Sequence, residues 1–375
     1  MPLSPIIDVR REEDARDIVH RAVQTLAEGG LVVFPTETVY GLAASARDEA
    51  AVARLAEVKG RAEGHPFSLA IRSAEDAIDY VPSMSPLAQR VARRCWPGPV
   101  TLVLGDGDDE SLLRQLPENV LKMVAPTGTV GLRVPAHSLI LDVLRMMAGP
   151  LVLTSANLSG EPDPINAQQA IAAFENKVEL ILDDGPSHYG QASTVLRVEG
   201  AELQILREGV VNEMAIRQLS NFTVLFVCTG NTCRSPMAEA ICRELIATRL
   251  GCQRDELPTR GVQVMSAGVS AVHGCPASAE AVAVLQESGI PFESHQSQPV
   301  TEQLLQHADL VFTMTSSHRD AIVRCWPHLS HRVQLLCVDR QDVCDPIGSP
   351  IEVYRQCSQQ IRGEIERRLD EFDLV

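Results

Sequence analysis

The distribution of apolar and polar positions predicts alternating strands and helices along the whole chain. In the second half, short continuous apolar runs, typical of strands buried in a parallel sheet, alternate with longer patterns of helical period. This alternation favours a doubly wound parallel sheet with helices on both faces. The strands are expected at 223–227, 262–266, 309–314 and 333–336, and the clearest helices at 277–289 and 351–372.

The first half also predicts strands and helices, but they do not alternate regularly. Its expected helices cover 12–28 and 49–59, and a Gly29-Gly30 pair separates the first of them from a strand at 31–34. Further apolar runs join directly to turns rich in Gly, Pro, Ser and Asn, which indicates strands followed by tight loops. These runs lie at 96–104, 130–135, 153–160, 193–198 and 206–211.

Length and composition indicate two globular domains. A chain of 375 residues, with 45% hydrophobic and 22% charged residues, is too long for one typical core and too apolar for a disordered protein. We expect domains at 1–211 and 222–375, joined by a short polar linker at 212–221. No apolar run approaches the roughly 20 residues of a membrane span, and the N-terminus lacks the pattern of a signal peptide. We therefore expect a cytoplasmic protein with no membrane contact.

Charge and cysteine spacing limit the classes of ligand. The net charge of −16, shared by both halves, argues against direct strong binding of nucleic acid. The ten cysteines include no C-x2-C pair, so the sequence predicts no metal site. Neither of the glycine-rich nucleotide motifs, G-x4-G-K-[ST] or G-x-G-x-x-G, is present.

The most informative stretch is T-V-L-F-V-C-T-G-N-T-C-R-S-P-M-A-E, residues 223–239. It predicts a buried strand, a tight polar loop and a helix, with Ser235 as the N-cap and Pro236 at the first helical position. Such a loop can turn its backbone N–H groups inward around a tetrahedral oxyanion. Gly230 and Asn231 are residue types that tolerate the positive φ of a tight curl.

Two side chains of this loop have the spacing of a phosphoryl-transfer site. Cys228 and Arg234 form a C-x5-R pair. The inward N–H groups and the helix dipole would hold Cys228 as a thiolate nucleophile, while the planar fork of Arg234 can hold two phosphate oxygens. Phosphoryl transfer to Cys228 also needs an acid for the leaving group and a base for the water that follows.

With these flanking residues the segment resembles the low-molecular-weight protein phosphatases, over about Phe222 to Asp370. The resemblance implies phosphorylated protein substrates and no cofactor. That family places its acid in an Asp-Pro loop, so the implied catalytic residues are Cys228, Arg234 and Asp345. Support of the loop and control of specificity are implied for Gly230, Asn231, Thr232, Cys233 and Ser235.

The first half carries a second set of motifs in a fixed order. They are P-T-E-T-V-Y-G-L (35–42), K-G-R (59–61), W-P-G-P-V-T-L (96–102), R-V-P (133–135), T-S-A-N-L-S-G (154–160), S-T-V (193–195) and R-E-G (207–209). Together they resemble the YrdC family of L-threonylcarbamoyl-AMP synthases across residues 1–211. The resemblance implies a twisted mixed sheet with helices, and an additional domain of some family members is here replaced by the phosphatase-like region.

Members of that family condense L-threonine, bicarbonate and ATP with release of pyrophosphate. The product feeds the threonylcarbamoyl modification of adenosine in transfer RNA, so a tRNA threonylcarbamoyl transferase is an implied partner. ATP is implied as a substrate together with Mg²⁺. An L-threonine site is implied at Thr36, Arg133 and Ser193, and ATP contacts at Lys59, Arg61, Thr129, Ser155, Asn157 and Arg207. One departure is Ala62, which replaces the proline of the usual K-x-R-P.

Physical reasoning is compatible with these assignments. Arg133 can hold the carboxylate of threonine, while Lys59 and Arg61 can offset charge on the departing pyrophosphate. An alternative for the whole chain is that one of the two domains is catalytically idle and serves only as a binding module.

The phosphoryl substrate is open between several alternatives. Thr232 stands where tyrosine-specific relatives usually have an aliphatic residue, and Ile347 follows Asp-Pro where an aromatic wall would stack on a phosphotyrosine ring. The loop resembles that of protein-arginine phosphatases, which favours phosphoarginine. Phosphotyrosine is retained as an alternative if Thr232 only packs. A lesser alternative is arsenate reduction, because Cys337 and Cys344 have the C-x6-C spacing of arsenate reductases.

Overall fold

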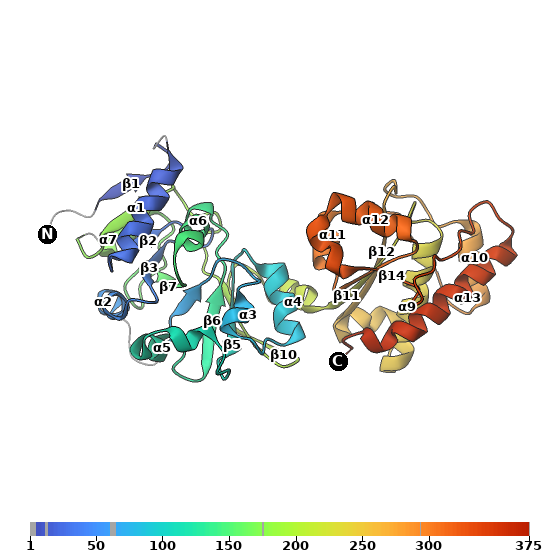
Figure 1. Ribbon diagram of the computed structural model, residues 1–375, viewed down its shortest axis with the longest axis horizontal. Helices are drawn as coiled ribbons and strands as arrows, with labels where there is room; N and C mark the ends of the chain where they lie inside the picture. The colour runs from blue at the N-terminus through green and yellow to red at the C-terminus, as the bar shows by residue number, and fades with distance from the viewer. Residues whose placement is uncertain (1–4, 12–13, 61–64, 175, 293, 375) are drawn as a thin grey trace. The chain divides into compact units, whose positions relative to one another are not determined.

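The computed structural model describes residues 5–11, 14–60, 65–174, 176–292 and 294–374. The chain forms two compact units, Met1–Ile216 and Arg217–Val375, each with its own sheet (Figure 1). The expected polar linker at 212–221 forms α8 (Glu213–Ser220), in which Ile216 is buried. None of the described helices combines the length and the apolar character that a membrane crossing requires.

The first unit is built on a ten-stranded mixed sheet, as the sequence predicted. The sheet contains parallel pairs, such as β4 with β6, and antiparallel pairs, such as β3 with β7. In spatial order the strands are β1 (Ile6–Asp8), β8 (Leu180–Asp183), β2 (Val32–Phe34), β3 (Gly41–Ser45), β7 (Leu151–Ser155), β4 (Ser68–Ala70), β6 (Thr129–Arg133), β5 (Val100–Gly105), β9 (Thr194–Glu199) and β10 (Glu202–Arg207).

Helices of the first unit are fixed by caps that the sequence supplies. α2 begins after Asp48, whose side chain accepts from the Ala51 N–H, and it ends at Gly60, where φ is +63°. These two caps place Lys59 at the last helical position. The helices of this unit are α1 (Ala15–Ala27), α2 (Glu49–Lys59), α3 (Ala77–Tyr80), α4 (Pro86–Cys95), α5 (Glu118–Val124), α6 (Ser138–Met146) and α7 (Ala167–Phe174).

The second unit has a four-stranded sheet that is parallel throughout, which confirms the predicted fold class. Its spatial order is β12 (Val262–Gly268), β11 (Phe222–Cys228), β13 (Leu310–Thr313) and β14 (Val333–Leu335). The helices are α9 (Arg234–Leu250), α10 (Ala279–Glu287), α11 (Glu302–His307), α12 (Ser316–Cys325) and α13 (Ile351–Arg368). The long helix expected at 351–372 therefore ends at Arg368 and continues as a short 3₁₀ segment, Leu369–Glu371.

The central strand β11 is buried along its whole length. Side chains at even positions, such as Phe226, pack with residues of α9 and α13, whereas Leu225 and Val227 pack with residues of α11 and α12. Because successive side chains of a strand point to opposite faces, both layers of helices are held by this strand (Figure 1). The carboxyl end of β11 is thereby fixed from both sides, and Cys228 stands at that end.

We expect Phe226→Ala to destabilise the second unit by about 3–5 kcal/mol, because it removes a fully buried ring that packs against Phe312. The measurement is urea unfolding followed by the fluorescence of Trp326, in a Trp96→Phe background. A Trp326→Phe background, in which Trp96 reports the first unit, serves as the control. An equal shift of both transitions would contradict the separation of the two cores.

Candidate active sites

The phosphate loop, residues 228–235, connects β11 to α9. Its first residue, Cys228, is 3% exposed. The sulfur lies 2.9 Å from Ser235 Oγ and accepts a hydrogen bond of 3.2 Å from the backbone N–H of Asn231. A hydroxyl and a backbone amide therefore lie within hydrogen-bond distance of the sulfur.

Asn231 fixes the shape of the loop through hydrogen bonds of its side-chain amide, its side-chain oxygen and its backbone oxygen. Its side-chain amide donates to Ser235 Oγ at 3.0 Å and to Ser266 Oγ at 2.8 Å. Its side-chain oxygen accepts from the Gln298 N–H at 2.9 Å, and its backbone oxygen lies 2.6 Å from His295 Nε2. Asn231 is fully buried and has φ +55°, the left-handed conformation that its residue type tolerates.

Two local expectations for this loop were wrong. Gly230 does not have a positive φ, because Asn231 alone makes the left-handed turn within the loop. Ser235 is not the N-cap and Pro236 is not the first helical residue, because α9 begins at Arg234 and Cys233 precedes it without a side-chain cap. Instead, the hydroxyl of Ser235 faces Cys228 Sγ and the backbone oxygen of Ala267. The Ser235 hydroxyl therefore contacts the Cys228 sulfur instead of capping the helix.

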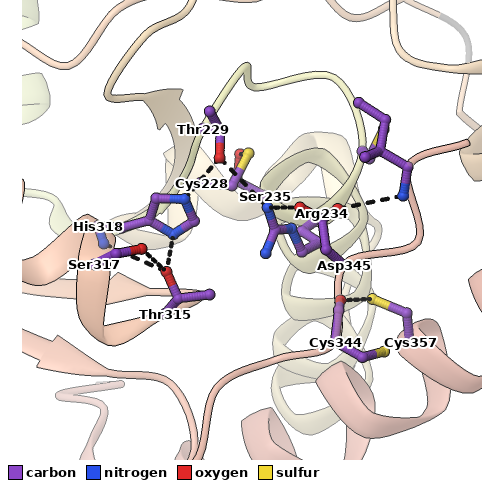
Figure 2. Close-up of polar contacts among 12 residues, drawn as sticks. Cys228, Thr229, Arg234, Ser235, Thr315, Ser317, His318, Cys344, Asp345 and Cys357 are labelled. Carbon is purple, nitrogen blue, oxygen red and sulfur yellow. Dashed lines mark hydrogen bonds and ion pairs between the residues drawn. The ribbon is translucent and has the colours of Figure 1, made fainter.

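Arg234 and Asp345 are brought together from positions far apart in the chain. Arg234 is buried at the start of α9, and its Nη2 donates to Asp345 Oδ2 at 2.7 Å. The side chain of Asp345 is 49% exposed, on the loop between β14 and α13. In Figure 2 the guanidinium lies beside the Cys228 loop with Asp345 directly next to it. In an in-line displacement by Cys228 the leaving group departs opposite the sulfur, and a half-exposed carboxylate beside Arg234 can supply its proton.

His318 also belongs to this site, and sequence reasoning missed it. Its Nε2 lies 2.8 Å from Thr229 Oγ1 and its Nδ1 lies 2.9 Å from Thr315 Oγ1 (Figure 2). Thr229 Oγ1 is also 3.4 Å from Arg234 Nη2. Burial, together with the nearby Arg234 charge, lowers the pKa of His318 to about 4. The signal in the sequence was its position just after β13, since the carboxyl ends of parallel strands meet at one edge.

Thr232 and Cys233 complete the loop on its other side. Thr232 Oγ1 lies 3.7 Å from Cys233 Sγ, and the Thr232 backbone oxygen accepts from the Ser278 N–H at 2.8 Å. Cys233 is buried and its sulfur lies 3.4 Å from Ser278 Oγ and 3.8 Å from the Tyr354 hydroxyl. All cysteines of the chain, including Cys337 and Cys344, are free thiols.

A half-buried carboxyl group, which the sequence analysis did not single out, supports a residue that holds the loop. Ser266 Oγ donates to Glu239 Oε2 at 2.6 Å, and burial raises the pKa of Glu239. Ser266 is thus held between this carboxyl group and the Asn231 amide. The local sequence signal was Glu239 within the otherwise apolar stretch Pro236–Cys242 of α9.

In the first unit, most of the predicted ligand-binding residues line one cavity of about 460 Å³. Those residues are Thr36, Thr129, Arg133, Ser155, Ser193 and Arg207. They come from loops and strand ends that are distant in sequence but adjacent in the mixed sheet. The cavity is large enough to hold several groups of a nucleotide or amino acid ligand.

Arg133 is fixed at the end of β6 by three partners. Its Nη2 donates to Glu37 Oε1 at 2.7 Å and to Thr38 Oγ1 at 2.8 Å, and its Nε donates to the Gly98 backbone oxygen at 3.3 Å. The second carboxylate oxygen of Glu37 is buried and has no hydrogen-bond partner among the residues that the structure describes. Sequence reasoning missed Glu37, although it follows Thr36 directly in the P-T-E-T motif.

The remaining predicted residues form two small groups at this cavity. Lys59 Nζ donates to Asn157 Oδ1 at 2.6 Å and to the Ser155 backbone oxygen at 2.6 Å. Arg207 Nη2 donates to the Ser193 backbone oxygen at 2.8 Å. Lys59 and Asn157 therefore reach the cavity wall through Ser155, which is itself a lining residue.

Arg61 and Ala62 lie outside the described residues, so the predicted ATP contact of Arg61 has no structural description. Thr36, which lines the cavity, donates its hydroxyl to the Val39 backbone oxygen at 2.6 Å, and its Oγ1 also accepts from the Thr38 N–H at 3.3 Å and lies 2.9 Å from Thr38 Oγ1. Among the described side chains, no group of three or more His, Cys, Asp and Glu residues is arranged to hold a metal ion.

We expect the contribution of His318 to stability to fall as the pH decreases from about 6.5 toward 4. The unfolded histidine, with a pKa near 6.5, binds a proton in this range, whereas the folded side chain stays neutral until about pH 4. Urea unfolding of the wild type and of His318→Gln at pH 7.5 and pH 5 measures this difference. The stability advantage of the wild type should be smaller at pH 5, and an unchanged advantage would contradict the lowered pKa.

Comparisons with known proteins divide the chain at the same place as its two sheets. Residues 24–209 match the Sua5, YciO and YrdC family model, which is described as telomere recombination. Residues 223–373 match the model of low molecular weight phosphotyrosine protein phosphatases.

Relatives of the first half include a putative threonylcarbamoyl-AMP synthase of Mycobacterium tuberculosis, 36% identical over 208 residues, 56% of this chain and 91% of the relative. A threonylcarbamoyl-AMP synthase of Pyrococcus abyssi is 37% identical over 206 residues, 54% of this chain and 57% of the relative. The chain thus spans little more than half the length of this second relative. The structure of a double mutant of P. abyssi Sua5 has 26% identity and a TM-score of 0.52, and covers 70% of this chain and 91% of that one.

For the second half, a protein-arginine-phosphatase of Geobacillus stearothermophilus is 39% identical over 150 residues, 39% of this chain and 93% of the relative. Both regions thus have relatives at more than 30% identity that they cover almost completely. The chain therefore belongs to two families, the Sua5, YciO and YrdC family in its first half and the low molecular weight phosphatases in its second.

Proposed function

We propose that the chain is a bifunctional enzyme. Its first unit makes L-threonylcarbamoyl-AMP from L-threonine, bicarbonate and ATP, and its second unit removes phosphoryl groups from phosphoarginine in proteins. The relatives named as threonylcarbamoyl-AMP synthases and as a protein-arginine-phosphatase support these two assignments. Since the substrates of the first reaction and transfer RNA meet in the cytoplasm, we place both reactions there.

The synthase proposal depends mainly on the shared cavity of Thr36, Arg133 and Ser193. Arg133, held in place by Glu37, presents its remaining guanidinium donors to the carboxylate of threonine. The threonine amine combines with bicarbonate, with loss of water, to give a carbamate. A carbamate oxygen then attacks the α-phosphorus of ATP, and pyrophosphate leaves. The product is proposed to pass to a tRNA threonylcarbamoyl transferase.

ATP is proposed to bind along the same wall. Ser155 and Arg207 line the cavity, and Lys59 lies behind Ser155 with its ammonium group buried and hydrogen-bonded. A fixed positive charge at this place offsets charge that develops on the departing pyrophosphate. Mg²⁺ is expected to accompany the ATP phosphates, and Asp163 is the acidic residue among those lining the cavity.

The phosphatase proposal depends on the grouping of Cys228, Arg234 and Asp345. Cys228 attacks the phosphorus, Arg234 holds the non-bridging oxygens, and Asp345 protonates the leaving nitrogen. Asp345 then takes a proton from the water that hydrolyses the phosphocysteine. No cofactor takes part in this sequence, and the alternative of arsenate reduction through Cys337 and Cys344 is not adopted because the matched relatives are phosphatases.

Phosphoarginine is preferred over phosphotyrosine because of the side chains at the mouth of the site. Thr232 is a small residue within the loop, and Ile347, which follows the Asp-Pro pair, is 68% exposed. Neither offers an aromatic face for a phenyl ring. Phosphotyrosine is the second candidate, since the matching family model carries that name.

In the first unit, we expect Arg133→Ala or Lys59→Ala to reduce kcat/KM by an amount equivalent to about 2–4 kcal/mol, as for the loss of one charge-stabilising contact. The assay is pyrophosphate release from ATP that requires both L-threonine and bicarbonate. Lys122→Ala, at an exposed lysine on α5, is the matched control and should leave the rate unchanged. If the wild type released pyrophosphate at the same rate with and without L-threonine, the synthase assignment would be refuted.

In the second unit, we expect Thr232→Ile to move the ratio of kcat/KM values toward phosphotyrosine by roughly 1–3 kcal/mol, the range for one pocket contact. Threonine leaves room and a hydroxyl near the leaving nitrogen, whereas isoleucine presents bulk and apolar surface. Peptides that carry phosphoarginine or phosphotyrosine serve as the two substrates, with wild type and variant compared side by side. If the wild type already preferred phosphotyrosine and Thr232→Ile had the same ratio of kcat/KM values, the arginine assignment would be wrong.

A further inference from the structure

One short turn contacts both catalytic loops of the second unit. We name it the β13–α12 turn, residues 314–318, between the end of β13 and the first turn of α12. On one side, the Met314 N–H donates to the Val227 backbone oxygen at 2.9 Å, and His318 Nε2 lies 2.8 Å from Thr229 Oγ1. The turn is thus joined to the strand and loop that carry Cys228.

On the other side, the same turn is joined to the acid loop, residues 336–350, which carries Asp345. The Ser316 N–H donates to Asp342 Oδ1 at 2.7 Å, and Ser316 Oγ donates to Asp342 Oδ2 at 3.3 Å. One residue further on, the Val343 N–H donates to the Met314 backbone oxygen at 2.8 Å. The acid loop is therefore held to the turn by both a side chain and the backbone.

The position of Asp342 is favourable for such a contact. Its carboxylate accepts from the first residue of α12, where the helix dipole and the unpaired N–H groups favour negative charge. Asp342 precedes Asp345 by only three residues, and the side chain of Val343 between them is 1% exposed. A displacement at Asp342 would therefore be passed on to Asp345 with little chain to absorb it.

We propose that Asp342 is a positioning residue of the phosphatase, whose contact with Ser316 sets the place of Asp345 relative to Cys228. This inference depends on the proposed function, in which Asp345 is the general acid. Asp342 does not touch the phosphoryl group in this arrangement. It acts by fixing the acid loop to the turn that also holds the phosphate loop.

The chemistry indicates how loss of this contact would be detected. As the S–P bond forms and the bond from phosphorus to the leaving group breaks, the leaving atom takes a proton from Asp345. A poor leaving group depends on this proton, whereas a leaving group that is stable as an anion departs without it. A displaced Asp345 therefore slows poor leaving groups selectively, while a general loss of structure slows both kinds equally.

The experiment compares phenyl phosphate, a poor leaving group, with 2,4-dinitrophenyl phosphate, a good one, using the full chain. The parameter is kcat/KM, which covers the steps up to cleavage of the substrate bond. Asp342→Ala should reduce kcat/KM for phenyl phosphate about tenfold, within the range known for small misplacements of catalytic groups, and should change the other substrate less than about twofold. For Asp342→Asn, kcat/KM for phenyl phosphate should lie between the values of the wild type and of Asp342→Ala, because the amide oxygen of asparagine can still accept from the Ser316 N–H.

Asp339→Ala is the matched control, since Asp339 lies in the same loop and its carboxylate accepts from the nearby Gln341 N–H. It should behave as the wild type. Asp345→Asn is the reference for loss of the acid and should show the strongest leaving-group selectivity. If Asp345→Asn is selective and Asp342→Ala is not, the inference about Asp342 is refuted alone. If Asp345→Asn shows no selectivity, the proposed role of Asp345 fails, and the inference fails with it.

Discussion

The hydrogen bonds of Asn231 are the constraint on which the phosphatase site depends. A fully buried amide in a left-handed conformation is stable only if its polar atoms find partners, because an unpaired buried group costs about 1–3 kcal/mol. Ser266, from β12, and Gln298, from the following loop, provide those partners. The shape of the phosphate loop is thus determined by the neighbouring strand and loop as well as by its own sequence.

In the first unit, an ion pair has the corresponding role. Arg133 and Glu37 have side chains that are 10% and 9% exposed, so neither charge is well solvated. Each therefore holds the other in a single arrangement, and Thr38 adds a second acceptor for the guanidinium. The arginine is thereby oriented before any ligand arrives, which reduces the entropic cost of holding a carboxylate.

Most features that depend on local sequence were predicted well, whereas individual contacts between residues distant in the chain were not. The bounds of α2 and the left-handed Asn231 follow from caps and residue type within a few positions. The contacts of Glu37 with Arg133 and of Asp342 with Ser316 join residues 96 and 26 positions apart, and no local pattern encodes them. Ser235 is a mixed case, because its capping preference was real but a tertiary contact with Cys228 used its hydroxyl instead.

The ion pair between Arg234 and Asp345 has a consequence for anion selectivity. Arg234 has a counter-ion, the carboxylate of Asp345, at 2.7 Å, and the side chain of Asp345 is half exposed. A monovalent anion such as chloride would replace Asp345 as the partner of Arg234. It would make one contact where Asp345 already makes one, so the gain in binding free energy would be small. A tetrahedral dianion offers the guanidinium two oxygens at once and also meets the backbone N–H groups of the loop. The ion pair thus favours a tetrahedral dianion over a monovalent anion as the partner of Arg234.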